Sequence, residues 1–290
     1  MEFLIQQLAN GIMMGSIYVL LALGLVIILS MMDIVNFSHG QLAMLGAYVI
    51  LFLMNIYHIP FFLGLIVTFL IIGILAFLIE KAIIRPTRLK KLPLLIAGIT
   101  TVGLAMIVEE VAQLIFGMNA RSILSPFAAE PVNLGIIQMS LMRLLIPIFV
   151  VILVIALMLF LFRTNAGRAL RAVSQDSEAA ALQGIHVDSA MTLGFVISCG
   201  LASLSGAFLA QMMPIDPYMG LLISLKGFAI IIVGGMMSLY GAIVASYLLG
   251  IGEVLVSGYI GANYKNLFFF GAMVLILLLR PSGLFGGDEK

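Results

Sequence analysis

Charged side chains are scarce in this sequence. Its 290 residues include 14 basic and 13 acidic side chains, or 9% of the chain, whereas a soluble domain carries about 25%. So few charges cannot cover the surface of a water-soluble globule of this size. The composition therefore excludes a soluble enzyme, a disordered chain and a nucleic-acid-binding protein. The net charge of +1 offers a polyanion no attraction.

Cysteine and tryptophan are also nearly or wholly missing. The single cysteine, Cys199, excludes a disulfide scaffold and a cysteine-rich metal site. The three histidines have no ligand spacing, so we expect no bound metal and no cofactor. Tryptophan is absent, so any aromatic belt at a membrane surface must consist of the 8 tyrosines.

Long uncharged runs are what the sequence has in abundance. The longest cover residues 3–32, 34–79, 92–108, 144–162, 189–215, 227–252 and 266–279. A helix needs roughly 20 mostly apolar residues to cross a bilayer. We expect helices near 5–31, 41–58, 60–84, 93–117, 144–162, 190–213, 221–237, 241–259 and 264–280. The predicted fold is all-α, a polytopic transmembrane bundle of about nine spans in a single domain, 1–290. Strands are not expected, because the apolar runs are far longer than a membrane strand needs and none alternates strictly.

Basic residues predict the orientation of the bundle. They gather in loop 80–91, in loop 163–189 and at the C-terminal end. Cytoplasmic loops carry an excess of Lys and Arg, so we place all three inside. Three predicted helices precede the first cluster, which puts the N-terminus outside and the C-terminus in the cytoplasm. Segment 118–143 is then external, and its prolines indicate irregular structure.

Small residues recur at the spacing of helix contacts. They form three rows: Gly11 with Gly15, Ala202 with Gly206, and Ala242 with Ser246 and Gly250. Such rows allow backbones to approach closely in lipid. They indicate either ordinary packing within the bundle or a contact with another subunit.

Loop 163–189 is too polar to span a membrane, yet part of it favours a helix. Residues 175–183 are rich in Ala, Leu, Gln and Glu, which predicts about 14 Å of helix. Ser174 or Asp176 can cap its start, and Gly184 can end it. Ala179, Ala180 and Ala181 have small side chains, so the predicted helix is narrow. It is either a connecting helix on the membrane surface or a rod that fits a groove.

Four stretches resemble a known family. Glu178-Ala179-Ala180 with Gly184 resembles the E-A-A-x-x-x-G element of ABC importer permeases. The longer stretch 167–185 is similar to branched-chain amino acid permeases, in particular to the first of their two paired permeases. Three more stretches agree with that family: N-F-S-H-G at 36–40, G-G-M-M-S-L-Y-G-A at 234–242, and R-P-S-G-L-F-G at 280–286. One departure is Met237, where the family usually has glycine, so the packing and the substrate size of relatives do not carry over directly.

The resemblance implies an ABC importer permease in the bacterial plasma (inner) membrane. Its partners would be a homologous second permease (a heterodimer, with a homodimer as the alternative), two ABC ATPase subunits and an extracytoplasmic solute-binding protein. The short helix of loop 163–189 would dock on the ATPase and couple its closure to transport. The coupling residues that this implies are Arg168, Arg171, Asp176, Glu178, Ala179, Ala180 and Gly184, and the helix-packing glycines are Gly234, Gly235 and Gly241.

Polar residues inside apolar segments are candidates for the substrate pathway. Asn36, Ser38 and His39 interrupt an uncharged stretch, where they either contact a polar solute, latch a gate or form a tight turn that caps the next helix. An acid at mid-membrane costs at least about 2.5–3.5 kcal/mol. Glu109 or Glu110 therefore faces protein, water or a partner, and a pair with Lys226 is conceivable.

Other functions remain as alternatives. The chain has no G-x-x-x-x-G-K-[ST] phosphate loop, so ATP must act on separate chains. An ion-coupled secondary transporter would use Glu109 and Glu110 as carriers, but no internal repeat is evident. A membrane enzyme ranks last, because no catalytic constellation appears. Within the permease family, urea, short amides and other amino acids are alternative solutes to leucine, isoleucine and valine.

Overall fold

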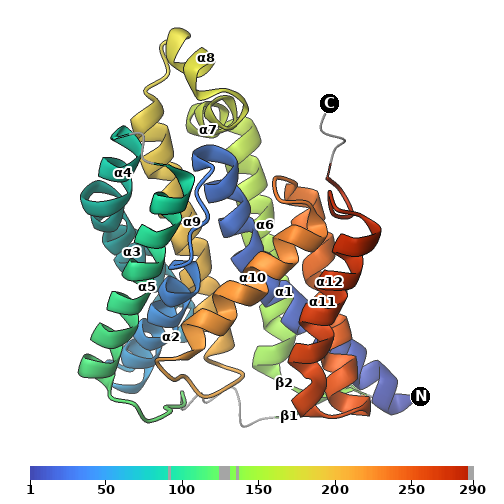
Figure 1. The fold of residues 1–290 in the computed structure, drawn as a ribbon. Helices are drawn as coiled ribbons and strands as arrows, with labels where there is room; N and C mark the ends of the chain where they lie inside the picture. Colours follow the sequence, from blue (N-terminus) through green and yellow to red (C-terminus); the bar gives the residue numbers. More distant parts are fainter. Residues whose placement is uncertain (91–92, 124–130, 135–136, 287–290) are drawn as a thin grey trace.

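Nine apolar helices form the bundle in the part of the chain that the computed structural model describes, which is residues 1–290 without 91–92, 124–130, 135–136 and 287–290 (Figure 1). They are α1 (Glu2–Met32), α2 (His39–Asn55), α3 (Phe61–Ile79), α5 (Leu94–Phe116), α6 (Leu141–Arg163), α9 (Val187–Leu209), α10 (Met219–Gly234), α11 (Leu239–Tyr259) and α12 (Lys265–Leu279). The all-α bundle predicted from the sequence is confirmed, and each predicted helix has a counterpart.

Seven of these helices are long and apolar enough to cross a membrane, by length and composition, when α12 is counted together with the 3-10 turn before it as Ala262–Leu279. The other two, α2 and α10, have 17 and 16 residues. At 1.5 Å per residue each is about 25 Å long, a little short of a typical 30 Å hydrocarbon core. Both follow a break in the chain.

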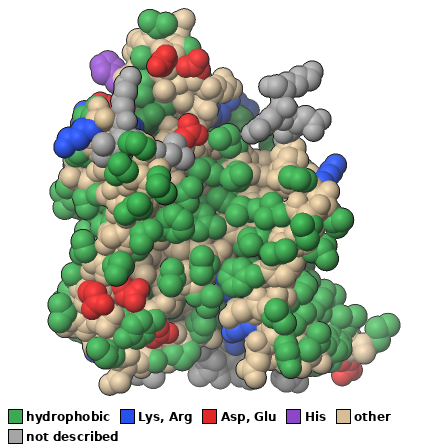
Figure 2. All heavy atoms as spheres, in the orientation of Figure 1, with side chains coloured by type: hydrophobic (Ala, Val, Ile, Leu, Met, Phe, Trp, Pro, Cys, Tyr) green, Lys and Arg blue, Asp and Glu red, His purple; other side chains and the backbone are tan. Residues whose placement is uncertain are grey.

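Helix α1 is the centre of the bundle. Its most extensive contacts are with α11 and α9, and α9 packs in turn on α2 and α3. Helices α5, α6 and α12 are peripheral and expose most of their surface. Figure 2 shows hydrophobic side chains over most of the visible face, the surface that lipid would cover. The hydrophobic runs of the sequence therefore fill both the interior and the outer surface.

The rows of small residues lie at contacts within the chain. Gly15 on α1 meets Gly250 on α11, and Gly206 on α9 meets the backbone of Ala43 on α2. In the same pair of helices, Gly46 on α2 faces the backbone of Ser203 on α9. Two helix pairs thus approach at backbone distance, as expected for bundle packing in lipid.

A short hairpin corrects the expectation of a fold without strands. Strands β1 (Pro131–Leu134) and β2 (Ile137–Ser140) pair antiparallel, with Pro131 opposite Ser140. The expectation rested on the length of the apolar runs, and the hairpin lies in the connection before α6, where that argument does not apply.

The two ends of the bundle differ in what they carry. Figure 1 shows the N-terminus and the hairpin at one end, and α4 (Arg85–Leu89), α7 (Asn165–Gln175), α8 (Ser177–Leu182) and the C-terminus at the other. We call the latter the α8 end. The described arginines of all three basic clusters, among them Arg85, Arg168 and Arg280, lie there, in agreement with the predicted placement of those clusters on one side of the membrane.

Candidate functional site

The break between α1 and α2 is held by its own side chains and by side chains from two other helices. The Asn36 side chain accepts hydrogen bonds from the backbone N–H (3.1 Å) and the hydroxyl (2.6 Å) of Ser38. The Phe37 N–H donates to Thr101 on α5, and the Phe37 carbonyl accepts from Ser224 on α10. Irregular backbone is tolerated inside a membrane where protein satisfies its polar groups. The break is therefore a built feature that joins α5 and α10 to the start of α2.

The structure places the predicted turn here, with one difference in detail. Ser38 is the N-cap residue of α2 but makes no side-chain cap bond, because its hydroxyl is bonded to Asn36. His39 is fully buried and its Nε2 lies 3.2 Å from the Leu21 carbonyl of α1. A side chain in this position holds α2 against α1.

An apolar cavity of about 540 Å³ lies beside the break. It lies between α1, α10 and α12. Its lining includes Asn36, Phe37, Leu225, Phe228, Met236 and Phe270. Small-molecule sites are typically apolar with a few polar groups, and this cavity falls in their usual size range.

The two acids of α5 are in different surroundings. Glu109 is partly buried, and its Oε2 accepts a hydrogen bond of 2.9 Å from Gln41 on α2. Glu110 is exposed on the outer side of α5. Neighbouring residues on a helix point about 100° apart, which explains why only one of them reaches the α2 side. The conceivable pair of either acid with Lys226 is wrong.

Lys226 instead joins a buried triad between α1, α10 and α11. Its Nζ lies 2.5 Å from Glu253 Oε1 and 3.0 Å from the Tyr18 hydroxyl. The Tyr18 hydroxyl donates to the other Glu253 oxygen at 2.7 Å. Lys226 and Glu253 are only 7% and 5% exposed, and the ammonium also lies 5.0 Å from the ring centroid of Phe269 on α12. Four helices therefore meet at one charge pair.

Glu253 is not the partner that the sequence predicted for Lys226. The signal was present, since Glu253 lies inside the apolar span predicted at 241–259. A charge in a membrane span indicates a partner on another span, but the sequence does not say which spans face each other. The acids of α5 were an equally good choice on that basis.

The predicted coupling loop forms two helices where one was expected. Helix α7 ends at Gln175, and Asp176 then accepts hydrogen bonds of 2.9 Å from the N–H groups of Glu178 and Ala179 at the start of α8. The predicted helix 175–183 is thus shortened to Ser177–Leu182. Gly184 follows α8 with a φ of +82°, a left-handed conformation that favours glycine.

Helix α8 protrudes from the α8 end (Figure 1). Ala180 is buried against the rest of the chain, whereas Glu178 and Ala179 are exposed and Leu182 is 88% exposed. The arginines of the loop lie on α7. Arg168 donates to the Asn165 side chain, and Arg171 donates to the Leu161 carbonyl at the end of α6. Of the predicted coupling residues on α8, Glu178 and Ala179 are therefore accessible at the surface, whereas Ala180 is not. Arg171 attaches α7 to the end of α6.

The glycines of the third motif lie at a tight contact. A Cβ on Gly234 would come within 2.5 Å of the Gly241 backbone, and Gly235 has a φ of +104°. The C-terminal motif folds back onto this turn, with Leu284 and Phe285 N–H groups donating to the carbonyls of Val233 and Gly234. Met237 is 62% exposed, so it does not widen this contact.

A bundle of apolar helices with buried polar contacts and a protruding capped helix at one end is the architecture of a membrane transport permease. The chain belongs to the family of branched-chain amino acid transport system permease components, whose model matches residues 7–278. Its relatives are transport permeases and not enzymes, which removes the membrane-enzyme alternative.

Curated relatives match along nearly the whole chain. The high-affinity branched-chain amino acid transport system permease protein LivH of Salmonella typhimurium is 31% identical over 99% of this chain and 97% of its own. The BraD protein of Pseudomonas aeruginosa is 29% identical over 98% of this chain and 96% of its own. A probable LivH of Methanocaldococcus jannaschii is 30% identical over 98% and 93%. No solved structure matches.

Proposed function

We propose that this chain is the permease subunit of an ABC importer that moves branched-chain amino acids inward, energised by separate ATPase subunits. The observation that carries the proposal is the capped, exposed helix α8, which lies within the family match over residues 7–278. ATPase closure would push on α8, and the bundle would then alternate between outward and inward openings. The α8 end would be cytoplasmic, with the N-terminus outside.

The apolar cavity beside the α1–α2 break supports an aliphatic solute. Its lining is almost wholly hydrocarbon, which suits the side chain of leucine, isoleucine or valine and suits urea or a short amide poorly. Asn36 at its edge, and the Gln41–Glu109 pair, whose Gln41 lies in the first turn of α2 after the break, would serve the polar end of the solute. A solute-binding protein would deliver it at the end that carries the hairpin, and a homologous second permease would complete the pathway.

The proposal is tested by reconstitution. The chain, co-expressed with its second permease and ATPases, is placed in lipid vesicles with a solute-binding protein, and uptake of labelled leucine is measured with and without ATP. Uptake that needs ATP supports an ABC importer. Uptake by the purified chain alone, driven by an ion gradient, would establish the secondary-transporter alternative.

Charge reversal on α8 should detach the ATPase. In the Glu178→Arg variant the exposed acid in the first turn of α8 becomes a cation, and we expect ATPase pull-down to fall severalfold while membrane insertion stays normal. The matched control is Glu2→Arg, the same reversal at an exposed acid at the opposite end. Normal pull-down and uptake by Glu178→Arg would remove the coupling role of α8.

Neutralising Glu109 should impair uptake more than neutralising its neighbour. Glu109→Gln changes the group that accepts from Gln41, whereas Glu110→Gln changes an exposed side chain on the outer side of α5. We expect a severalfold loss of leucine uptake for the first and little change for the second. Equal uptake by both variants and the wild type would place neither acid at the pathway.

A further inference from the structure

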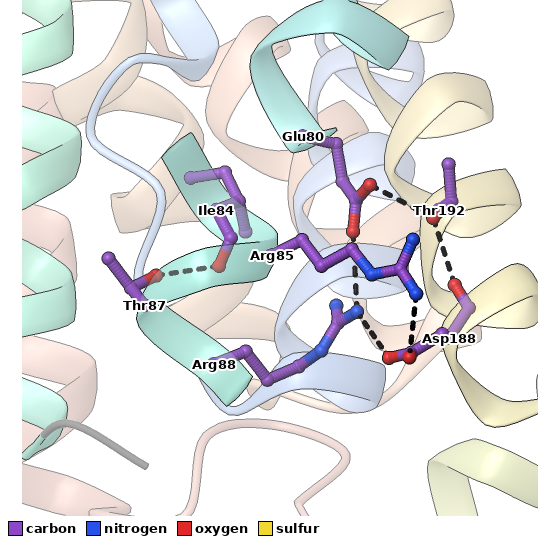
Figure 3. Close-up of polar contacts among 7 residues, drawn as sticks. All are labelled: Glu80, Ile84, Arg85, Thr87, Arg88, Asp188 and Thr192. Atoms are coloured by element: carbon purple, nitrogen blue, oxygen red, sulfur yellow. Dashed lines mark hydrogen bonds and ion pairs between the residues drawn. The ribbon is translucent and has the colours of Figure 1, made fainter. Parts of the chain in front are cut away.

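Four charged side chains at the α8 end form a network that none of the roles above uses (Figure 3). Helix α3 runs on through the π-helix η1 (Glu80–Ile84) into α4, and Asp188 lies in the first turn of α9. Arg85 and Arg88 on α4 both donate to Asp188, at 3.0 and 2.8 Å, and Arg88 lies 3.3 Å from Glu80. One arginine therefore joins the end of α3 to the start of α9.

The network is anchored in the protein interior. Glu80 is fully buried, while Asp188 is 40% exposed at its outer edge. The Thr192 hydroxyl, one turn into α9, lies 2.9 Å from both a Glu80 carboxylate oxygen and the Asp188 carbonyl, and its one hydrogen is shared between these two acceptors. Two cations balance two anions, so every charge in this group has an opposite partner. Such a group holds two segments in a fixed geometry.

One of the two segments that it joins, α9, lies next to helix α8. The main contacts of α8 are with α7 and α9, and only residues 183–186 separate it from the start of α9. A displacement of α8 therefore enters the bundle through α7, which packs on α6, and through the first turn of α9. Asp188 is in that turn. Below it, α9 packs on α1, α2 and α3.

A π-helix lies on the α3 side of the charged network. Glu80–Ile84 forms one π-helical stretch where α3 leaves the bundle, and π-turns inside α-helices are frequent at functional sites. The Thr87 hydroxyl donates to the Ile84 carbonyl, which stabilises the change from η1 to α4. Figure 3 shows Glu80, Arg85 and Arg88 directed from this turn toward α9.

We propose that this network is a rigid joint that makes the ends of α3 and α9 move as one body when α8 is displaced, with Arg88 as its positioning residue. The inference rests on the proposed function, because it assigns the network a part in coupling ATP hydrolysis to transport. It adds a second route into the bundle, from α8 through α9 to α3. Loss of the joint would leave α8 docked on the ATPase but let α9 slip against α3.

The test replaces the ion pair with a covalent link. Arg85→Cys and Asp188→Cys are combined in a Cys199→Ser background, which leaves no other cysteine in the chain, and assembled with the partner subunits in vesicles. Without cross-linking, we expect ATP hydrolysis to continue while leucine taken up per ATP falls roughly tenfold, the usual size of a coupling between two sites. A short bifunctional methanethiosulfonate reagent should restore uptake, and a reductant should reverse the restoration.

Controls separate this role from folding and from the proposed function. Lys81→Ala removes an exposed cation of the same π-helix that lies over Phe77 and outside the network, and it should leave coupling unchanged. If the cysteine pair does not assemble, Asp188→Asn and Asp188→Glu replace it. Asp188→Asn, which removes the charge, should uncouple ATP hydrolysis from uptake. Asp188→Glu, which keeps a carboxylate, should retain much of the coupling.

Two results would overturn the inference. Uptake that stops on cross-linking would mean that the joint must open, and normal coupling in the cysteine pair or in Asp188→Asn would mean that the network has no part in coupling. The wild-type complex is the reference for both. If the wild type itself shows no ATP-dependent uptake, the proposed function fails, whatever the variants do.

Discussion

A Lys226→Met variant should lose about 3–5 kcal/mol of unfolding free energy, the usual cost of removing one partner from a buried ion pair. Glu253, which is 5% exposed, would keep the Tyr18 hydroxyl as its one hydrogen-bonding side chain within the described part of the chain. The loss is measured by reversible denaturation of the purified chain in detergent micelles. Lys81→Met is the matched control, because it removes an exposed lysine from the same chain.

The double variant separates the pair from its individual charges. Replacing a buried ion pair with apolar residues of similar volume is often neutral or stabilising, so Lys226→Met with Glu253→Leu should recover much of the stability that Lys226→Met loses. Unaltered stability in the single variant would show that water or another group compensates Glu253. A stable double variant that no longer transports leucine would give the pair a role in function in addition to packing.

A Gly206→Ala variant should lose about 3 kcal/mol or more of unfolding free energy. A Cβ at this position would overlap the Ala43 carbonyl oxygen, and it would lie 2.5 Å from the Ala43 carbonyl carbon. These are backbone atoms, which cannot turn aside as a side chain can, so α2 and α9 must separate. Overpacking typically costs about 1–3 kcal/mol, and we expect a loss at or above the top of that range, measured in the same denaturation assay.

Matched glycine controls lie on a neighbouring helix. Gly98 and Gly103 on α5 have nothing within 4 Å of an added Cβ. Alanine there should be neutral or stabilising by up to about 1 kcal/mol, because alanine has the higher helix propensity. A Gly206→Ala protein as stable as these two variants would contradict the close approach of α2 and α9.

The sequence predicts what depends on local composition. Hydropathy located all nine apolar helices, since each needs only a run of apolar residues. Local capping preferences gave Gly184 as the end of the short helix and Ser174 or Asp176 as its start, and the structure selects Asp176. The stop at Gln175 was missed, because residues on both sides of Asp176 favour helix and only the aspartate's own hydrogen bonds show the break.

What the sequence could not supply is the choice of neighbours. The pairs Lys226–Glu253 and Arg88–Asp188 join residues far apart in the chain, and any acid in an apolar span or basic loop fits such a partner equally well. The hairpin was missed for a related reason, since two strands of four residues need each other to form. The positions of the helices therefore follow from neighbouring residues in the sequence, whereas the choice of ion-pair partner depends on how the helices pack.

The return of the C-terminal motif to the turn at Gly235 has a consequence for biosynthesis. The carbonyls of Val233 and Gly234 receive their donors from Leu284 and Phe285, which leave the ribosome only after α11 and α12 have been made. Until then, the last turn of α10 has to find water or other temporary partners. The final hydrogen bonds of this helix thus form after the whole bundle has entered the lipid.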